Sequence, residues 1–108
     1  MIYTIEEIRS IIAPIAKKYR LPAVYLFGSY ARGNATEKSD IDILVDTTGT
    51  DLKSLFSLGA LYVELEDALN KKIDLITVSS LEQKTKMPSQ EQFRDTVMRE
   101  RVTVYDAA

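Results

Sequence analysis

The sequence contains no cysteine and no histidine. Without cysteine there is no disulfide framework and no thiol nucleophile. Without histidine there is no Ser-His-Asp triad, and the absence of both residues removes the usual ligands of zinc. Any chemistry must come from carboxylates, Lys, Arg, Tyr and hydroxyl groups. A metal ion bound by such side chains would have oxygen ligands, which suits Mg²⁺ or Mn²⁺.

Long hydrophobic runs and a strong charge of either sign are also missing. The 108 residues carry a formal net charge of -2, and non-specific binding to nucleic acid relies on neutralising many phosphates. We therefore expect no direct binding to nucleic acid. No segment approaches the length of a membrane span, and the N-terminus lacks the pattern of a signal peptide. We expect a cytoplasmic protein with no membrane contact, built as one domain over residues 1–108.

The pattern of apolar residues predicts helices and strands in alternation. Thr4 and Glu7 have the spacing of a capping box that begins a helix, and Pro14 should kink or split that helix. We expect strands over 23–27, 40–45 and 73–78, and a strand or extended tail over 102–105. We expect a helical turn over 30–32 and helices over 52–70 and 81–87. A last helix should begin with a capping box formed by Ser89 and Gln92 and end near Glu100. This order indicates an α/β (α+β) fold with a small mixed sheet flanked by helices.

The predicted helix over 52–70 has a wide apolar face. Its apolar residues are Leu52, Leu55, Phe56, Leu58, Leu61, Tyr62, Leu65 and Leu69. One interpretation is that this face is buried on the sheet. The other is that part of it meets a partner protein.

Asp40 and Asp42 begin a predicted strand. Residues two apart on a strand point to the same face, roughly 7 Å from each other. Two carboxylates at that spacing repel, and a cation between them removes the repulsion. The alternative is a half-exposed strand with aspartates outward and isoleucines inward, as we expect for Asp46 at its end.

Gly28 and Ser29 follow a predicted buried strand and precede a helical turn. A Gly-Ser step in that position can direct backbone N–H groups and a hydroxyl at an anion, and Arg32 could reach a phosphate or pair with a site carboxylate. The simpler alternative is a turn with no ligand. The sequence is neither a G-x-x-x-x-G-K-[ST] P-loop nor a dinucleotide-binding G-x-G-x-x-G motif.

Asp74 lies inside the predicted strand over 73–78, between apolar neighbours. If that strand lies beside 40–45, its carboxylate could join Asp40 and Asp42, bind a metal ion and accept the proton of an attacking hydroxyl. The alternative is a salt bridge to Lys71 or Lys72.

These segments together resemble a known family. The run G-S-Y-A-R-G at 28–33, then S-D-I-D at 39–42, then I-D-L-I at 73–76 is similar to the minimal nucleotidyltransferases of the DNA polymerase β-like superfamily. Ten residues separate Ser29 from Asp40, as in that family's pattern. The resemblance runs from the first helix to about Val78 and, more loosely, to the tail.

The resemblance implies a site and a reaction. Asp40, Asp42 and Asp74 would hold two Mg²⁺ ions, with Mn²⁺ as an alternative, while Gly28, Ser29 and Arg32 would bind ATP or another nucleoside triphosphate. It implies transfer of a nucleoside monophosphate to an acceptor hydroxyl, with Asp74 as the base and pyrophosphate leaving.

The resemblance also implies a partner and a second function. Minimal nucleotidyltransferases are often antitoxins of HEPN-domain RNase toxins, and some adenylylate a tyrosine of the toxin. We therefore expect a hetero-oligomer with a HEPN partner. A binding antitoxin that masks its partner by contact, through the apolar face of 52–69 and the tail 94–105, is the alternative from another class. Transfer to a small molecule such as an aminoglycoside is the third.

Overall fold

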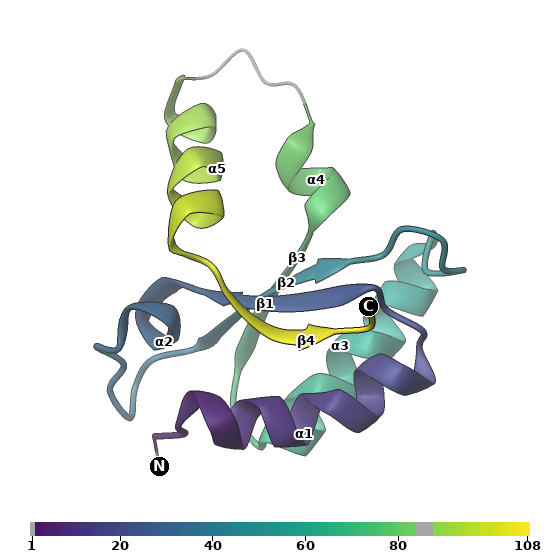
Figure 1. Ribbon diagram of the computed structural model, residues 1–108, viewed down its shortest axis with the longest axis horizontal. Helices are drawn as coiled ribbons and strands as arrows, with labels where there is room; N and C mark the ends of the chain where they lie inside the picture. Colours follow the sequence, from purple (N-terminus) through teal and green to yellow (C-terminus); the bar gives the residue numbers. More distant parts are fainter. Residues whose placement is uncertain (1, 84–87) are drawn as a thin grey trace.

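A computed structural model describes residues 2–83 and 88–108. Its centre is a four-stranded sheet with helices on both faces (Figure 1). The strands are β1 (Ala23–Phe27), β2 (Ile41–Asp46), β3 (Ile73–Thr77) and β4 (Val102–Asp106). The helices are α1 (Ile5–Lys18), α2 (Gly28–Arg32), α3 (Leu55–Leu69), α4 (Val78–Glu82) and α5 (Pro88–Glu100). The sheet order is β3-β2-β1-β4, with β2 and β3 parallel and the other pairs antiparallel, which confirms the predicted small mixed sheet.

The main core lies between the sheet and the layer formed by α1 and α3. Alternation along β2 directs Ile41, Ile43 and Val45 into this core, where each is completely buried. Leu61 and Leu65 of α3 meet them there. Complete burial of one such side chain stabilises the fold by about 1.5–3 kcal/mol, so this layer holds the strands in place.

The opposite face of the sheet has a smaller core and carries α4 and α5 (Figure 1). Phe27, Leu44 and Val97 are its buried members. The Phe27 and Phe93 rings meet edge to face, with centroids 6.1 Å apart. These contacts place α5 over the end of β1, on the face to which Asp42 belongs by alternation with Ile41 and Ile43.

The first helix is continuous through Pro14. The capping box is confirmed, because Glu7 N–H donates to Thr4 Oγ1 at 3.0 Å and Thr4 N–H donates to Glu7 Oε1 at 2.9 Å. The prediction that Pro14 splits the helix is wrong. Proline removes one donor only, and the buried residues Ile12 and Ala16 on either side keep the helix docked on the core.

Helix α3 begins three residues later than predicted, at Leu55, and ends at Leu69. Ser54 is the N-cap, in a reciprocal pair with Ser57, and it stops the helix from reaching back to Leu52. The apolar face is only partly buried: Leu55 is 89% exposed and Phe56 is 93% exposed. The burial of this helix on the sheet is therefore confirmed for Leu61, Leu65 and Leu69, whereas Leu55 and Phe56 project away from the core.

The elements near the C-terminal end differ more from expectation. Helix α4 begins at Val78 and ends at Glu82. Thr77 is its N-cap, and the Thr77 hydroxyl accepts a hydrogen bond from Ser80 N–H at 3.1 Å. The remainder of the helix predicted over 81–87 lies mostly outside the described residues. Ser89 lies within α5 and is not its N-cap, so the second capping box is wrong. The predicted final strand is confirmed as β4, and strands 40–45 and 73–78 are each shifted or shortened by one residue.

No helix within residues 2–83 and 88–108 is long and apolar enough to cross a membrane.

Candidate active site

The turn from β1 into α2 brings the backbone of Gly28 against Asp42. Phe27 and Asp42 are register partners on antiparallel strands, so the next residue passes directly beside the carboxylate. Gly28 has a φ of +69°, and a Cβ added there would come within 2.0 Å of Asp42 Oδ2. Only glycine fits this position, which explains the Gly of the Gly-Ser step by sterics as well as by backbone conformation.

Asp42 and Asp74 are aligned on neighbouring strands. They are register partners in the parallel pair β2–β3, so their side chains project from the same face of the sheet. Asp40 lies one residue before β2. Burial first, and then the carboxylates of Asp74 and Asp40, raise the pKa of Asp42 to about 6, and the guanidinium of Arg32 opposes this rise. The fold therefore collects the three predicted carboxylates into one electrostatic environment.

Asp74 is exposed, and the alternative that it forms a salt bridge with Lys71 or Lys72 is not observed among the described residues. Lys71 Nζ donates instead to the carbonyl oxygen of Glu37 at 2.8 Å. Across residues 2–83 and 88–108, no ion pair joins Asp74 to Lys71 or Lys72. Its carboxylate is left facing the same side as Asp42.

Arg32 contacts a partner that the sequence did not indicate. Helix α2 ends at Arg32 because Gly33 takes a left-handed conformation with a φ of +80°. Arg32 Nη1 then lies 3.3 Å from Glu100 Oε2, near the end of α5. The sequence predicts that Arg32 reaches a phosphate or pairs with a carboxylate of the site. Its partner is instead Glu100, which comes from a helix far along the chain.

A cavity of about 320 Å³ joins these groups. Its lining residues are Phe27, Gly28, Arg32, Asp42, Asp74, Phe93, Thr96, Val97 and Glu100. Four predicted site residues therefore line one space. Ser29 and Asp40 are not part of this lining: Ser29 lies in the first turn of α2, where its carbonyl accepts from Asn34 N–H at 3.0 Å, and Asp40 immediately precedes β2.

Sequence reasoning missed the contribution of α5 to the cavity. Phe93, Thr96, Val97 and Glu100 have the three- and four-residue spacing of one helical stripe, so the pattern is present in the sequence. It was not informative, because a mixed stripe of aromatic, hydroxyl, apolar and acidic residues is equally typical of a solvent-facing helix.

The residues present suit a hard divalent cation held jointly with a ligand. Within the described part of the chain, no group of three or more Asp, Glu, His or Cys residues forms a ready cage for a metal ion. Mg²⁺ is usually bound through one or two carboxylates together with waters and substrate phosphates. The aligned pair Asp42 and Asp74 has the oxygen donors and the mutual repulsion that such an ion would relieve.

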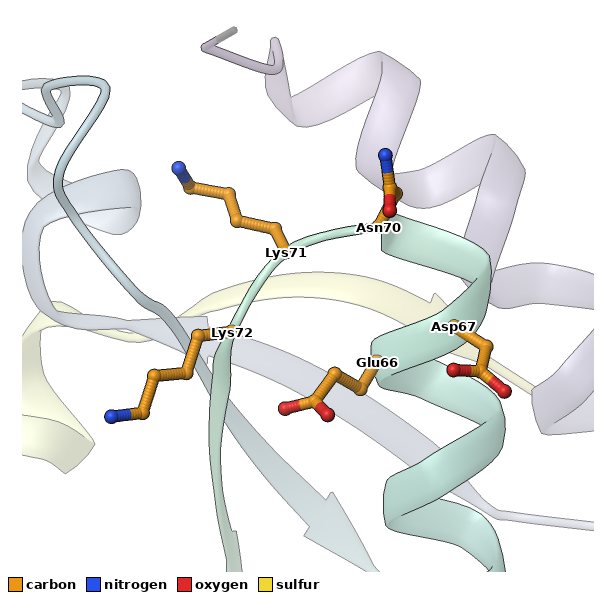
Figure 2. A pocket seen from close by; sticks show the side chains of 5 residues that line it. All are labelled: Glu66, Asp67, Asn70, Lys71 and Lys72. Atoms are coloured by element: carbon orange, nitrogen blue, oxygen red, sulfur yellow. The ribbon is translucent and has the colours of Figure 1, made fainter.

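A second depression, of about 660 Å³, lies on the surface where α3 ends and β3 begins. Figure 2 shows its lining side chains fanning outward from the ribbon, with lysines and carboxylates side by side; they are Glu66, Asp67, Asn70, Lys71 and Lys72. None of the predicted site residues lines it. Its mixed charges are typical of a solvated surface, and the cavity beside Asp42 remains the candidate site.

The sheet aligns two aspartates beside a Gly-Ser turn, as the resemblance to the nucleotidyltransferases led us to expect. The family described as polymerase beta, nucleotidyltransferase matches residues 10–107, and the chain belongs to that family. Relatives of this chain are named protein adenylyltransferases, several of them provisionally.

Two relatives in sequence and one solved structure show the extent of the similarity. The chain is 42% identical over 82 residues to the protein adenylyltransferase MntA of Thermococcus cleftensis, covering 72% of this chain and 81% of that protein. It is 44% identical over 77 residues to a Methanocaldococcus jannaschii protein provisionally named a protein adenylyltransferase, covering 71% of this chain and 81% of the other. A solved structure of a toxin–antitoxin with AMP-PNP has the same fold, with a TM-score of 0.69 at 24% identity, covering 92% of this chain and 73% of that one.

Proposed function

We propose that this nucleotidyltransferase transfers AMP from ATP to a hydroxyl in a reaction that requires Mg²⁺. In this proposal Asp40, Asp42 and Asp74 hold two Mg²⁺ ions, with Mn²⁺ as a substitute. Gly28, Ser29 and Arg32 bind the triphosphate, and the whole site lies in one minimal domain. The observation that carries the proposal is the cavity that joins Gly28 and Arg32 to the aligned pair Asp42 and Asp74.

Gly28, Ser29 and Arg32 each contribute differently to binding the phosphates. Gly28 allows the backbone to pass close to Asp42, so the N–H groups of the turn and the Ser29 hydroxyl can meet the phosphates. Arg32 contributes a fixed positive charge to the same cavity. When bound, the divalent ions stabilise the negative charge that develops on the α-phosphate and on the leaving group.

Proton transfer falls to Asp74 in this proposal. The acceptor oxygen forms a bond to the α-phosphorus as the bond from that phosphorus to the bridging oxygen of the β-phosphate breaks. Pyrophosphate leaves with the bonding electrons, and the proton of the acceptor hydroxyl passes to the Asp74 carboxylate. Asp74 is exposed, so an acceptor can approach it from solvent.

For the acceptor we propose a tyrosine of a HEPN-domain RNase toxin, to which this chain would be the antitoxin in a hetero-oligomer. Two comparisons support the coarser part of this choice, a protein acceptor in a toxin–antitoxin pair. The relative from Thermococcus cleftensis is named a protein adenylyltransferase, and a protein with the same fold was solved as a toxin–antitoxin with AMP-PNP.

A second candidate function is neutralisation of the toxin by contact alone. The exposed first turn of α3 favours it, since Leu55 and Phe56 are the two most exposed large apolar residues among those described. Exposed apolar side chains next to each other are typical of an interaction surface.

One experiment separates the two functions. The protein is incubated with Mg²⁺, labelled ATP and the protein that the neighbouring gene encodes, and the mass of that neighbour is measured. We expect an increase of one AMP, absent with the variant Asp40→Ala/Asp42→Ala, together with loss of RNase activity. Full neutralisation by the double variant without added mass would establish the contact mechanism and reject the catalytic one.

A further inference from the structure

The ion pair between Arg32 and Glu100 is placed at the candidate site without being needed for the fold. Arg32 Nη1 and Glu100 Oε2 are 3.3 Å apart, and the side chains are 45% and 30% exposed. Ion pairs this accessible to water contribute little to stability. Both residues nevertheless line the cavity that holds Gly28, Asp42 and Asp74. We therefore look for the effect of this ion pair in the cavity and not in the stability of the fold.

The three aspartates of the site carry more negative charge than Glu100 and also attract the guanidinium of Arg32. Asp40 and Asp74 lie close enough to Asp42 to act on it through their charges, and Arg32 acts on Asp42 with the opposite sign. Even so, no ion pair joins Arg32 to Asp42 in the described part of the chain, and the direct contact is with Glu100. A guanidinium bound to Asp42 would occupy carboxylate oxygens that the proposed function assigns to a metal ion.

The geometry of the contact leaves most of the guanidinium available. Arginine has five N–H donors in a planar fork, and the bond to Glu100 involves the single nitrogen Nη1. The remaining N–H groups of Arg32 can meet phosphate oxygens in the cavity.

We propose that Glu100 is a positioning residue that holds Arg32 on the α5 side of the cavity, away from Asp42, with its free N–H groups directed at the β- and γ-phosphates of a bound triphosphate. The inference rests on the proposed function and extends it to α5. An arginine already held in place loses less rotamer freedom when the ligand binds, which strengthens binding.

Simple repulsion predicts the opposite effect. Glu100 is a carboxylate beside an anionic ligand, so its removal should strengthen binding if it acts only through its charge. If it positions Arg32, its removal should weaken binding. The direction of the change therefore distinguishes the two roles.

The test is calorimetric titration of ATP and of AMP, each with Mg²⁺, into the wild type, Glu100→Gln, Arg32→Ala and the double variant. We expect Glu100→Gln to weaken ATP binding about five-fold, within the range of coupling between contacting residues. AMP lacks the β- and γ-phosphates, so its affinity should change less than about two-fold. In the Arg32→Ala background, Glu100→Gln should have no further effect. Glu91→Gln, on the exposed first turn of α5, is the matched control and should bind like the wild type.

Tighter or unchanged ATP binding by Glu100→Gln, or additive effects in the double variant, would overturn the inference. So would an equal loss of ATP and AMP affinity, which indicates general damage to the cavity. A wild type that binds no ATP and transfers no nucleotide would reject the proposed function and this inference with it. A wild type that binds ATP while Glu100→Gln matches it rejects the inference alone.

Discussion

At the scale of single residues, the closest constraint is the approach of Gly28 to Asp42. No side chain fits at Gly28, because the φ is positive and the nearest carboxylate oxygen occupies the place of a Cβ. The two residues are fourteen positions apart in the sequence and become neighbours only through the pairing of β1 with β2.

Replacing Gly28 by alanine should abolish nucleotide transfer and destabilise the protein. The added methyl group displaces the Asp42 carboxylate, and the left-handed backbone conformation costs about 1–2 kcal/mol for a residue with a side chain. Thermal unfolding and the transfer assay measure the two effects. Gly59→Ala is the control: this residue is exposed within α3 with open space around it, so alanine should raise stability by about 0.5–1 kcal/mol. Full activity of Gly28→Ala would contradict the proposed geometry.

The carboxylates of the site should make the metal-free protein less stable as pH rises. The pKa of Asp42 is raised to about 6 by burial and by its acidic neighbours, above the unfolded value of 3.8. Between these values the folded state binds more protons than the unfolded state, so stability falls from pH 4 to pH 6 and stays lower above it. Urea unfolding in a chelator should show this trend.

Asp42→Asn tests the origin of that trend. The amide removes the charge that is repelled by Asp40 and Asp74, so this variant should be more stable than the wild type at pH 7 and should lose the decline between pH 4 and pH 6. It should also be inactive. A wild-type pH profile that persists unchanged in Asp42→Asn would assign the trend to other groups.

At the scale of elements, α3 has two parts that differ in burial. Its later turns bury Leu61, Leu65 and Leu69 in the core, while Leu55 and Phe56 in its first turn face solvent. Ser54 sets this division, because the capping pair with Ser57 fixes where the helix begins.

Substitutions in the two parts of α3 should therefore act differently. Leu65→Ala should lower the free energy of unfolding by about 2–5 kcal/mol, since it opens a cavity in the core. The double variant Leu55→Ser/Phe56→Ser should stay within about 0.5 kcal/mol of the wild type for each substitution. If the first turn of α3 contacts the partner, the same double variant loses binding to the HEPN protein in a pull-down or titration. Retained binding at full affinity would remove this turn from the interface.

At the scale of the whole molecule, the fold is held together by its apolar core. Both faces of the sheet are covered by helices, and the larger core joins α1, α3 and the strands. Asp40 and Asp74 are exposed. A metal ion at the site would therefore serve the reaction more than the folding of the chain.

Removal of divalent metal should stop the reaction without unfolding the protein. We expect a chelator to abolish AMP transfer while the circular dichroism spectrum stays unchanged, and added Mg²⁺ or Mn²⁺ to restore transfer. Mg²⁺ together with ATP at about 100 times its Kd should raise stability by about 2.7 kcal/mol, because the ligand binds only the folded state. Transfer that continues in excess chelator would reject the metal-dependent proposal.

The sequence by itself determined that the chain forms a small sheet flanked by helices, because short, continuous apolar runs such as Ala23–Phe27 are typical of buried strands. It also indicated the candidate site residues, because Gly28 follows a buried strand and because Asp42 and Asp74 are carboxylates within predicted strands. The tertiary structure decided which of them meet. The parallel register of β2 with β3 aligned Asp42 with Asp74, and the packing of α5 brought Glu100 to Arg32 across 68 residues. Local patterns record the conformation of a segment, whereas contacts between distant side chains depend on how whole elements pack.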